Sequence, residues 1–214
     1  MSGDKRKALL VTGSSLTAAV GLLVLPGAWK TRGCGPREVD GVTTLDDAVT
    51  ACRRTGLKGW ELVLYAQRLV YDKFAFYSLR NGWDTPTRAF ARGMGYCTQY
   101  NLALGQLLEQ LGFEVDPVFS RRIRAFDDPD WTMGHTWLRV TLEGETLDVC
   151  AGHADNRPGA VNFVPLAPVL RGSRTIFFLT NLGLILFSGF IDWKALISRQ
   201  SPPAWMFMAR PRRG

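Results

Sequence analysis

The sequence predicts an α+β fold in which a cysteine-bearing helix packs on an antiparallel sheet, with apolar segments at the N- and C-terminal ends. Three observations lead to this prediction. Leucines at positions 104, 107, 108 and 111 recur at the spacing of one buried helix face. From His135 onward, side chains alternate in the pattern of a strand. Glu143-Gly144 then predicts a turn into a second strand, as in a β-hairpin. Two long runs, 8–29 and 175–191, contain no charged residue.

The first part of the chain, 1–32, is predicted to be a membrane segment. Basic residues precede the run 8–29, which would span about 33 Å as a helix at ~1.5 Å per residue, enough for a bilayer core. Glycine, serine and proline residues dilute the run. A cleaved signal peptide and a helix packed on a soluble domain therefore remain alternatives.

The main domain is predicted to cover residues 33–170, and this part opens with helices. Thr44 to Asp47 has the pattern of a capping box and predicts a short helix. A second helix is expected from Trp60 to Phe74, where apolar residues share one face. Thr85-Pro86 predicts a third helix, which delivers the chain to a glycine-containing loop before Cys97.

Cys97 stands where the leucine-rich helix should begin, directly after Gly93-Met94-Gly95 and one tyrosine. The first turn of a helix offers unpaired backbone N–H groups and the positive end of the helix dipole. Both favour a thiolate, and the N–H groups can stabilise an oxyanion. Cys97 is therefore the candidate nucleophile, with a small buried hydrophobic residue as the alternative.

A cysteine nucleophile needs a base, and the chain contains two histidines. His135 opens a predicted strand, whereas His153 falls in a polar loop, so His135 is the candidate base. Asp148 lies on the returning strand and is the candidate group that orients the imidazole. The predicted catalytic residues are thus Cys97, His135 and Asp148. Their chemistry requires no metal and no organic cofactor, so none is predicted.

This ordered set resembles the transglutaminase-like superfamily of cysteine acyl-transfer enzymes and proteases, which have a papain-like core. The matching residues are Gly95-Tyr96-Cys97, Leu111-Gly112-Phe113, His135-x-Trp137 and Asp148. The resemblance covers residues 85–152. It implies that the domain 33–170 is transglutaminase-like and that it carries a Cys-His-Asp triad. Arylamine N-acetyltransferases share the ancestral core and are resembled more distantly, through Gly95-Tyr96-Cys97, Asn101 and the stretch from Asp148 to Gly152.

The spacing between His135 and Asp148 departs from the pattern of these families. Asp148 follows His135 by thirteen residues, slightly fewer than is usual. A turn at Glu143-Gly144 would set His135 opposite Gly152 and displace Asp148 by about 13 Å along the strand at ~3.3 Å per residue. A tighter turn or a bulge would bring Asp148 back to the imidazole. Two further candidates for the orienting role follow the strand: Asp155 and Asn156.

The last part of the chain, 171–214, is predicted to hold an apolar segment and an unstructured basic tail. The run 175–191 is short for a membrane span, so a helix buried on the domain or lying in the membrane surface is an equal alternative. If both apolar runs span, basic residues near both termini place the ends inside and the domain outside. The protein is therefore expected to be membrane-associated through 8–29 and 175–191.

The bulk properties narrow the classes of partner. The chain of 214 residues carries a net charge of +7 and has a pI near 9.5. It shows no zinc-finger spacing, RNA-binding aromatic motif or compact basic helix, so no nucleic-acid partner is predicted. The four cysteines form no CxxC pair, which argues against a zinc site.

The leading functional prediction is a transglutaminase-like cysteine enzyme that attacks peptide or carboxamide carbonyls and forms a thioester acyl-enzyme. Water or an amine then resolves that intermediate. The expected partners are a protein or peptide substrate and an amine acceptor. Two alternatives remain open: an acyl-CoA-dependent N-acyltransferase, and a non-catalytic, membrane-associated interaction module.

Overall fold

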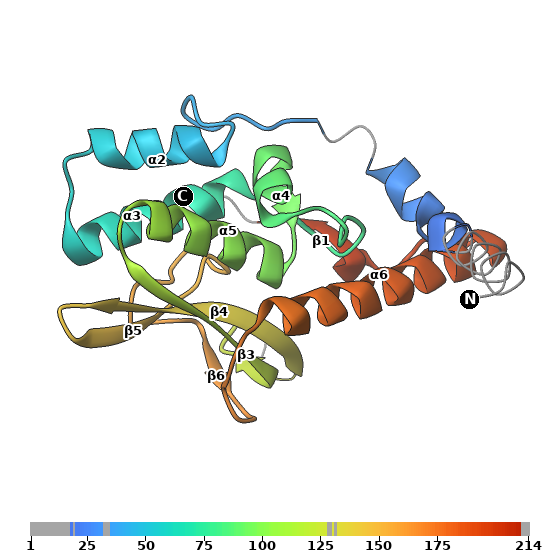
Figure 1. Cartoon of the computed structure of the whole chain (residues 1–214). Helices are drawn as coiled ribbons and strands as arrows, with labels where there is room; N and C mark the ends of the chain where they lie inside the picture. The colour runs from blue at the N-terminus through green and yellow to red at the C-terminus, as the bar shows by residue number, and fades with distance from the viewer. Residues whose placement is uncertain (1–17, 19, 32–34, 128–129, 131, 211–214) are drawn as a thin grey trace, which may run out of the picture.

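The computed structural model describes residues 18, 20–31, 35–127, 130 and 132–210 (Figure 1). The helices are Val20–Lys30, α2 (Leu45–Arg54), α3 (Gly59–Lys73), α4 (Pro86–Arg92), α5 (Cys97–Gln110), α6 (Arg174–Ile197) and the 3-10 turn Ala204–Met206. The strands are β1 (Phe76–Ser78), β2 (Met94–Gly95), β3 (Glu114–Ala125), β4 (Thr132–Leu142), β5 (Glu145–Val149), β6 (Phe163–Pro165), β7 (Leu170–Arg171) and β8 (Phe207–Ala209).

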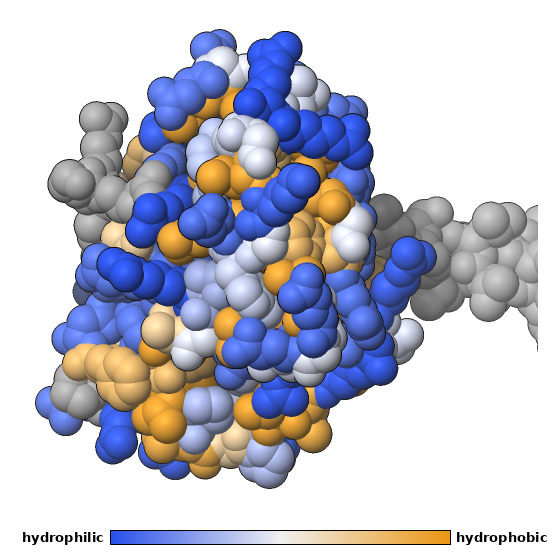
Figure 2. All heavy atoms as spheres, turned by 90° about the vertical axis from the view of Figure 1, so that its left-hand side faces the viewer, coloured by the Kyte–Doolittle hydropathy of each residue, from blue (hydrophilic) through white to orange (hydrophobic). Residues whose placement is uncertain are grey.

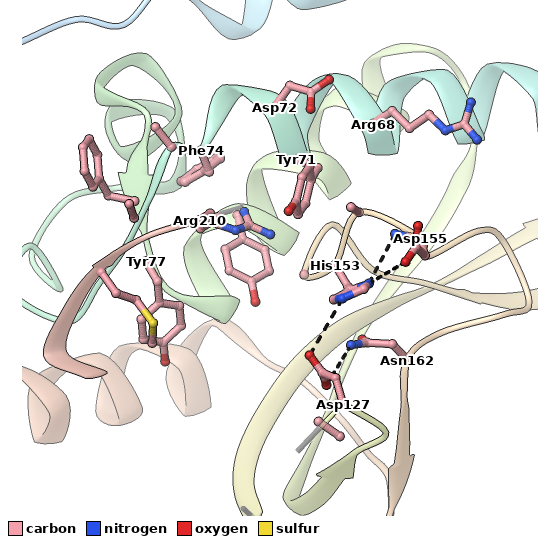
Figure 3. A pocket seen from close by; sticks show the side chains of 18 of the residues that line it. Arg68, Tyr71, Asp72, Phe74, Tyr77, Asp127, His153, Asp155, Asn162 and Arg210 are labelled. Carbon is pink, nitrogen blue, oxygen red and sulfur yellow. Dashed lines mark hydrogen bonds and ion pairs between the residues drawn. The ribbon is translucent and has the colours of Figure 1, made fainter. Parts of the chain in front are cut away.

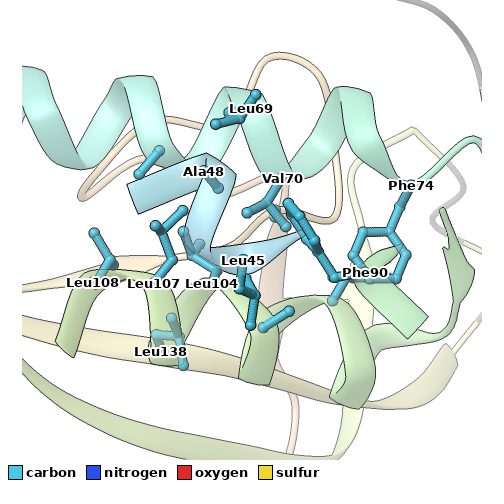
Figure 4. Packing of buried hydrophobic residues seen from close by; sticks show 14 of the residues in the cluster. Leu45, Ala48, Leu69, Val70, Phe74, Phe90, Leu104, Leu107, Leu108 and Leu138 are labelled. Carbon is cyan, nitrogen blue, oxygen red and sulfur yellow. The ribbon is translucent and has the colours of Figure 1, made fainter. Parts of the chain in front are cut away.

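A layer of helices lies over a mainly antiparallel sheet, so the predicted α+β class is confirmed (Figure 1). The larger sheet has the order β5-β4-β3-β6, and β7 pairs with β3. Helix α5 lies between this sheet and α2 and α3. Figure 4 shows the reason: the side chains of Leu104, Leu107 and Leu108 point from α5 toward the other helices, while Leu138 of β4 lies below. All four side chains are fully buried. Their burial fixes α5 on the sheet.

The local patterns in the sequence form the elements that they predict. The Thr44 side chain accepts from the Asp47 N–H at 3.2 Å while the Asp47 carboxylate accepts from the Thr44 N–H at 2.8 Å, which completes the capping box of α2. Glu143 and Gly144 have φ angles of +51° and +85° and make the tight turn between β4 and β5. Gly112 ends α5 with φ +92°.

The C-terminal tail differs from its prediction, because part of it is a strand. β8 pairs antiparallel with β1, which also pairs with the short β2 directly before Cys97. Phe207 stacks on Phe76 with ring centroids 5.2 Å apart. The tail therefore satisfies backbone groups on the open edge of β1, a long-range partner that the tail's own composition does not reveal. Residues 211–214 lie outside the described part.

Helix α6 is longer than the charge-free run 175–191 that predicted it. It continues past Asp192, which is 1% exposed because Arg80 and Lys30 bind its carboxylate at 3.2 Å and 3.6 Å. Within the described residues, α6 is the one helix long and apolar enough to cross a membrane, and 22% of its most apolar window is buried. The earlier run, 8–29, is described only at 18 and 20–29.

Candidate active site

The start of α5 is held by a buried glutamine. Gly93 ends α4 with φ +67° and turns the chain into β2 and then into Cys97. The Gln99 side chain accepts a hydrogen bond from the Tyr96 N–H at 3.2 Å and donates to two loop carbonyl oxygens at 2.9 Å and 2.8 Å. These bonds fix the first turn of the helix and thereby the position of the Cys97 side chain.

The Cys97 thiol is almost entirely buried, with 9% of the residue exposed. Burial raises the pKa of this thiol, whereas the Thr136 backbone and the side chain and backbone of Thr98 act in the opposite direction. The thiol is therefore the resting form at neutral pH, and the thiolate expected from the helix start is not. The reason is that desolvation outweighs the stabilising N–H and hydroxyl groups.

His135 lies on β4, directly before Thr136, which contacts α5. The hydroxyl groups of Thr98 and Thr136 lie 3.1 Å apart and join the turn after Cys97 to the strand directly after His135. Burial and the Arg210 charge lower the imidazole pKa to about 4, so the ring is neutral at pH 7. Although both residues are described, no hydrogen bond joins Cys97 to His135 in this resting arrangement.

Asp148 does not reach His135, because the strand register carries its side chain elsewhere. It pairs with Arg139 across β4 and β5, and its carboxylate accepts from Trp137 Nε1 at 2.9 Å and Arg139 Nε at 3.3 Å. The turn at Glu143-Gly144 keeps the register that the sequence suggested, without a tighter turn or bulge. The structure thus brings Cys97 and the His135 strand together and leaves the Asp148 carboxylate away from the imidazole.

Neither alternative orienting residue contacts the imidazole. The Asp155 side chain is 92% exposed, with an oxygen 3.8 Å from His153 Nδ1. The Asn156 side chain donates to the Cys150 carbonyl at 3.0 Å and accepts from the Asn162 N–H at 2.8 Å. Asn156 therefore fixes the loop after β5.

The imidazole instead lies against Cys150. His135 Nε2 is 3.3 Å from Cys150 Sγ, and the ring packs edge-on against Phe163 at 4.8 Å between centroids. Asn101 of α5 joins the surrounding segments: its amide nitrogen donates to the Thr136 carbonyl at 2.6 Å and to Cys150 Sγ at 3.4 Å. Its amide oxygen accepts from the Ala151 N–H at 2.9 Å. One buried side chain thus ties α5, β4 and the end of β5 together.

A cleft of about 1860 Å³ leads to His135 and Gly152 (Figure 3). Arg210, directly after β8, lies 4.3 Å and 4.7 Å over the rings of Tyr71 and Tyr100 and donates to the Ala151 carbonyl at 2.6 Å. Figure 3 shows the tail bringing Arg210 to one wall, while His153 and its acidic neighbours form the other. In the described part of the chain, no three potential metal-ligating side chains gather.

Three residues of this site were not among the sequence candidates: Cys150, Tyr100 and Arg210. A signal for Cys150 was present, since continuing the hairpin register beyond Leu138 and Val149 sets Cys150 opposite Trp137, diagonal to His135. Tyr100 follows Cys97 by three residues and so lies one helical turn along α5. Arg210 gave no local signal, because only the pairing of β8 with β1 brings it to the cleft.

A family model described as N-acetyltransferase matches residues 90–162, about a third of the chain. The match includes Cys97, His135, Asp148 and Cys150. It concerns the family that the sequence resembles more distantly, and it supports an acyl-transfer core for this segment. No curated protein matches the chain.

Proposed function

We propose that this protein is a cysteine-dependent N-acyltransferase, which takes an acyl group from a thioester such as acetyl-CoA and transfers it to a small-molecule amine. The observation that carries the proposal is the placement of Cys97 at the start of α5, next to the strand that bears His135, inside the segment matched by the N-acetyltransferase model. A nucleophile, a base and helix N–H groups in that arrangement suit acyl transfer.

The proposed reaction has two acyl transfers. In the first, His135 accepts the Cys97 proton, sulfur attacks the thioester carbonyl, and the donor leaves as a thiolate that takes the proton from the imidazolium. In the second, the amine attacks the Cys97 thioester and loses a proton to His135, which returns it to the Cys97 sulfur. Backbone N–H groups at the start of α5 stabilise the oxyanion in both steps.

The composition of the cleft supports an amine as acceptor. Aromatic side chains line it, and its lining includes five carboxylates and three arginines although the whole chain has a net charge of +7. The local excess of acidic groups attracts cationic molecules, which include most amines at neutral pH. The arginines offer contacts for the phosphate groups of a nucleotide thioester.

Intact-mass measurement after exposure to acetyl-CoA tests the proposal. Wild type is expected to gain one acetyl group, which an added aliphatic amine removes, and Cys97→Ala is expected to gain none. Cys52→Ala is the matched control, because Cys52 is also a buried cysteine but lies in α2. Should the thioester form only with a glutamine-containing peptide, the carboxamide chemistry of a transglutaminase-like enzyme would replace this proposal. If neither acetyl-CoA nor the peptide forms a thioester on the protein, both enzymatic proposals fail and the non-catalytic interaction module is the remaining alternative.

A further inference from the structure

The sulfur of Cys150 occupies a buried position between two hydrogen-bond donors and the His135 imidazole. Cys150 is fully buried, and its Sγ lies 3.3 Å from His135 Nε2, 3.4 Å from Asn101 Nδ2 and 3.3 Å from the Gly152 backbone nitrogen. The Asn101 amide is oriented by the Ala151 N–H, which must bond to an oxygen, so Nδ2 is the group that faces Cys150. Two N–H groups therefore donate to the sulfur from other directions.

We propose that Cys150 is the positioning residue for His135, in the place that Asp148 was predicted to take. Asn101 and Gly152 donate to the two lone pairs of the neutral sulfur, so the S–H of Cys150 is left to donate to His135 Nε2. A neutral imidazole carries one N–H, so this bond puts the imidazole proton on Nδ1 and leaves Nε2 as the basic nitrogen. The inference rests on the proposed function where it concerns rate, but the tautomer is measurable without activity.

Packing holds the same geometry. The His135 ring is stacked on Trp137 at 6.2 Å and meets Phe163 edge-on at 4.8 Å, so its plane is fixed from two sides. Asp148 meanwhile holds Trp137 through the indole N–H at 2.9 Å. The Asp148 carboxylate therefore affects the imidazole only indirectly, by holding Trp137, which stacks against it. The Cys150 thiol contacts the ring nitrogen directly.

The first test measures the tautomer of the His135 imidazole from its ¹⁵N chemical shifts. The protein used carries His153→Gln, so that His135 is its one remaining histidine and its signals are assigned directly. Wild type is expected to show Nδ1–H at His135. Cys150→Ala is expected to lose that preference, and Cys150→Asp to reverse it to Nε2–H and to raise the imidazole pKa, because an anion that can only accept replaces a neutral thiol that donates. Asp148→Asn is the matched control and is expected to leave both unchanged.

The second test is the rate of Cys97 acylation. Cys150→Ala is expected to slow it by roughly ten- to a hundredfold with little change in KM, and Cys150→Asp to restore it, whereas a purely structural role predicts no rescue. If Cys150→Ala does not fold, Cys150→Ser replaces it in both measurements. A tautomer that follows Asp148→Asn instead of Cys150 overturns the inference and leaves the acyltransferase standing. If the tautomer instead changes with substitutions at Cys150 but Cys97 is never acylated, the role of Cys150 stands and the proposed acyltransferase activity is overturned.

A separate observation concerns the outer side of α6. One side of this helix packs on the domain: the Asn181 side chain accepts a hydrogen bond from the Tyr96 hydroxyl, and Leu184 packs against the core. The other side is exposed and apolar along several turns. We call it the α6 face and define it by Phe178, Leu179, Leu182, Leu186 and Phe190, which are 38–66% exposed.

The charges around the α6 face suit an anionic lipid surface. The only acidic residue between positions 171 and 200 is Asp192, and its carboxylate is buried in ion pairs. Exposed cations lie at both ends of the helix: Arg174 at the start, and Lys194 and Arg199 at the end, while Arg171 pairs with Asp116 of β3. An apolar stripe with cations at its ends and no exposed acid on the helix itself is the pattern of a helix that lies in the headgroup region.

The helix Val20–Lys30 extends this surface. It crosses α6 at Gly189, where a Cβ would lie 2.7 Å from the Leu23 carbonyl oxygen, and the Trp193 indole donates to the Leu22 carbonyl at 2.8 Å. It also exposes large apolar side chains, Leu22, Leu25 and Trp29, before the exposed cation Lys30 at its end. The opposite end of the molecule differs, since Figure 2 shows hydrophilic side chains interrupting the hydrophobic ones over that face.

We infer that the α6 face lies in the plane of an anionic bilayer and that α6 does not span it. The contacts at Asn181, Leu184 and Asp192 recur along α6 and hold it against the domain, so a spanning helix would have to lose them.

Depth-dependent quenching tests this inference. Single cysteines at Phe178, Leu186 and Phe190 carry a fluorophore, and vesicles of phosphatidylcholine and phosphatidylglycerol carry nitroxides at shallow or deep positions. Equal, shallow quenching at all three sites is expected, with none at the control Thr50→Cys on α2. A spanning helix would separate positions 178 and 190 by about 18 Å in depth at ~1.5 Å per residue. Graded depths, or no quenching at all, would overturn the inference.

Discussion

The imidazole of His135 connects the site to the pH dependence of folding. Its pKa is about 4 in the folded protein, below the ordinary value near 6.5, because burial and Arg210 disfavour the charged form. Between these two values the unfolded chain binds a proton that the folded chain does not. We therefore expect the free energy of unfolding to be highest above pH 6.5 and to fall by up to about 3 kcal/mol as the pH approaches 4.

Urea unfolding between pH 7 and pH 4.5 measures this loss. His135→Gln removes the titrating group and is expected to flatten the pH dependence over that interval. His153→Gln removes the other histidine of the chain and is the control. An unchanged slope in His135→Gln would show that another group is responsible.

Asn101 is expected to matter more for stability than any other polar residue of the site. Asn101→Ala removes the partners of the Thr136 carbonyl and the Ala151 N–H, both inside the protein, and one donor to Cys150. Leaving such groups unpaired predicts a loss of about 2–4 kcal/mol in the free energy of unfolding. Asn162→Ala is the control, since that side chain makes one exposed bond of 3.5 Å to Asp127. Equal losses in the two variants would contradict the prediction.

The sequence predicted that Cys97 begins a helix and that His135 lies on a strand, because each depends on a local pattern: glycines before a helix, and an alternating stretch. The predicted strand start at His135 is wrong, since β4 already begins at Thr132, where pairing with β3 extends it. The partner of His135 depends instead on which residue of β5 lies beside it. That choice follows from the register after the turn, and a shift of two residues exchanges Asp148 for Cys150 on the same face. Residue type favoured the carboxylate, whereas geometry selects the thiol.

The connection from α4 to α5 predicts a difference between two glycines. At Gly93, φ is +67° and a Cβ would lie 2.5 Å from Arg37 Cδ and 2.6 Å from the Lys73 carbonyl oxygen. At Gly112, φ is +92° but nothing lies within 4 Å of that Cβ. Gly112→Ala should therefore cost about 1 kcal/mol from backbone strain alone, and Gly93→Ala clearly more, because packed backbone must also move. Chemical denaturation of both variants compares them directly.

The helices and the central hairpin were predictable because their signals lie within the segments themselves, as in the leucines of α5 and the Glu143-Gly144 turn. β8 and the length of α6 were not. β8 forms because β1 presents an open edge, and α6 continues through Asp192 because Arg80 and Lys30 neutralise its charge. In both cases a partner far away in the chain decides the structure, and no local pattern records it.

Asp192 joins three distant parts of the molecule: α6, the helix Val20–Lys30 and the loop after β1. Its carboxylate is 1% exposed and binds Arg80 at 3.2 Å and Lys30 at 3.6 Å, while Gly27 packs directly against it. Asp192→Ala would leave the largely buried Arg80 guanidinium without its anion, which typically costs about 3–5 kcal/mol. Because the core of α3, α5 and the sheet makes no use of these groups, the loss should appear as local opening of the two apolar helices.

Hydrogen–deuterium exchange resolves local from global opening. In Asp192→Ala, amides in residues 20–30 and in the second half of α6 are expected to exchange faster by at least tenfold, while those of α5 and β4 keep their protection. Lys194→Ala, also on α6 but exposed, is the matched control and should leave both regions unchanged. Faster exchange throughout α5 in Asp192→Ala would instead show that the apolar helices and the core of α5 and the sheet unfold as one cooperative unit, so that the α6 face and the candidate site would be coupled through stability.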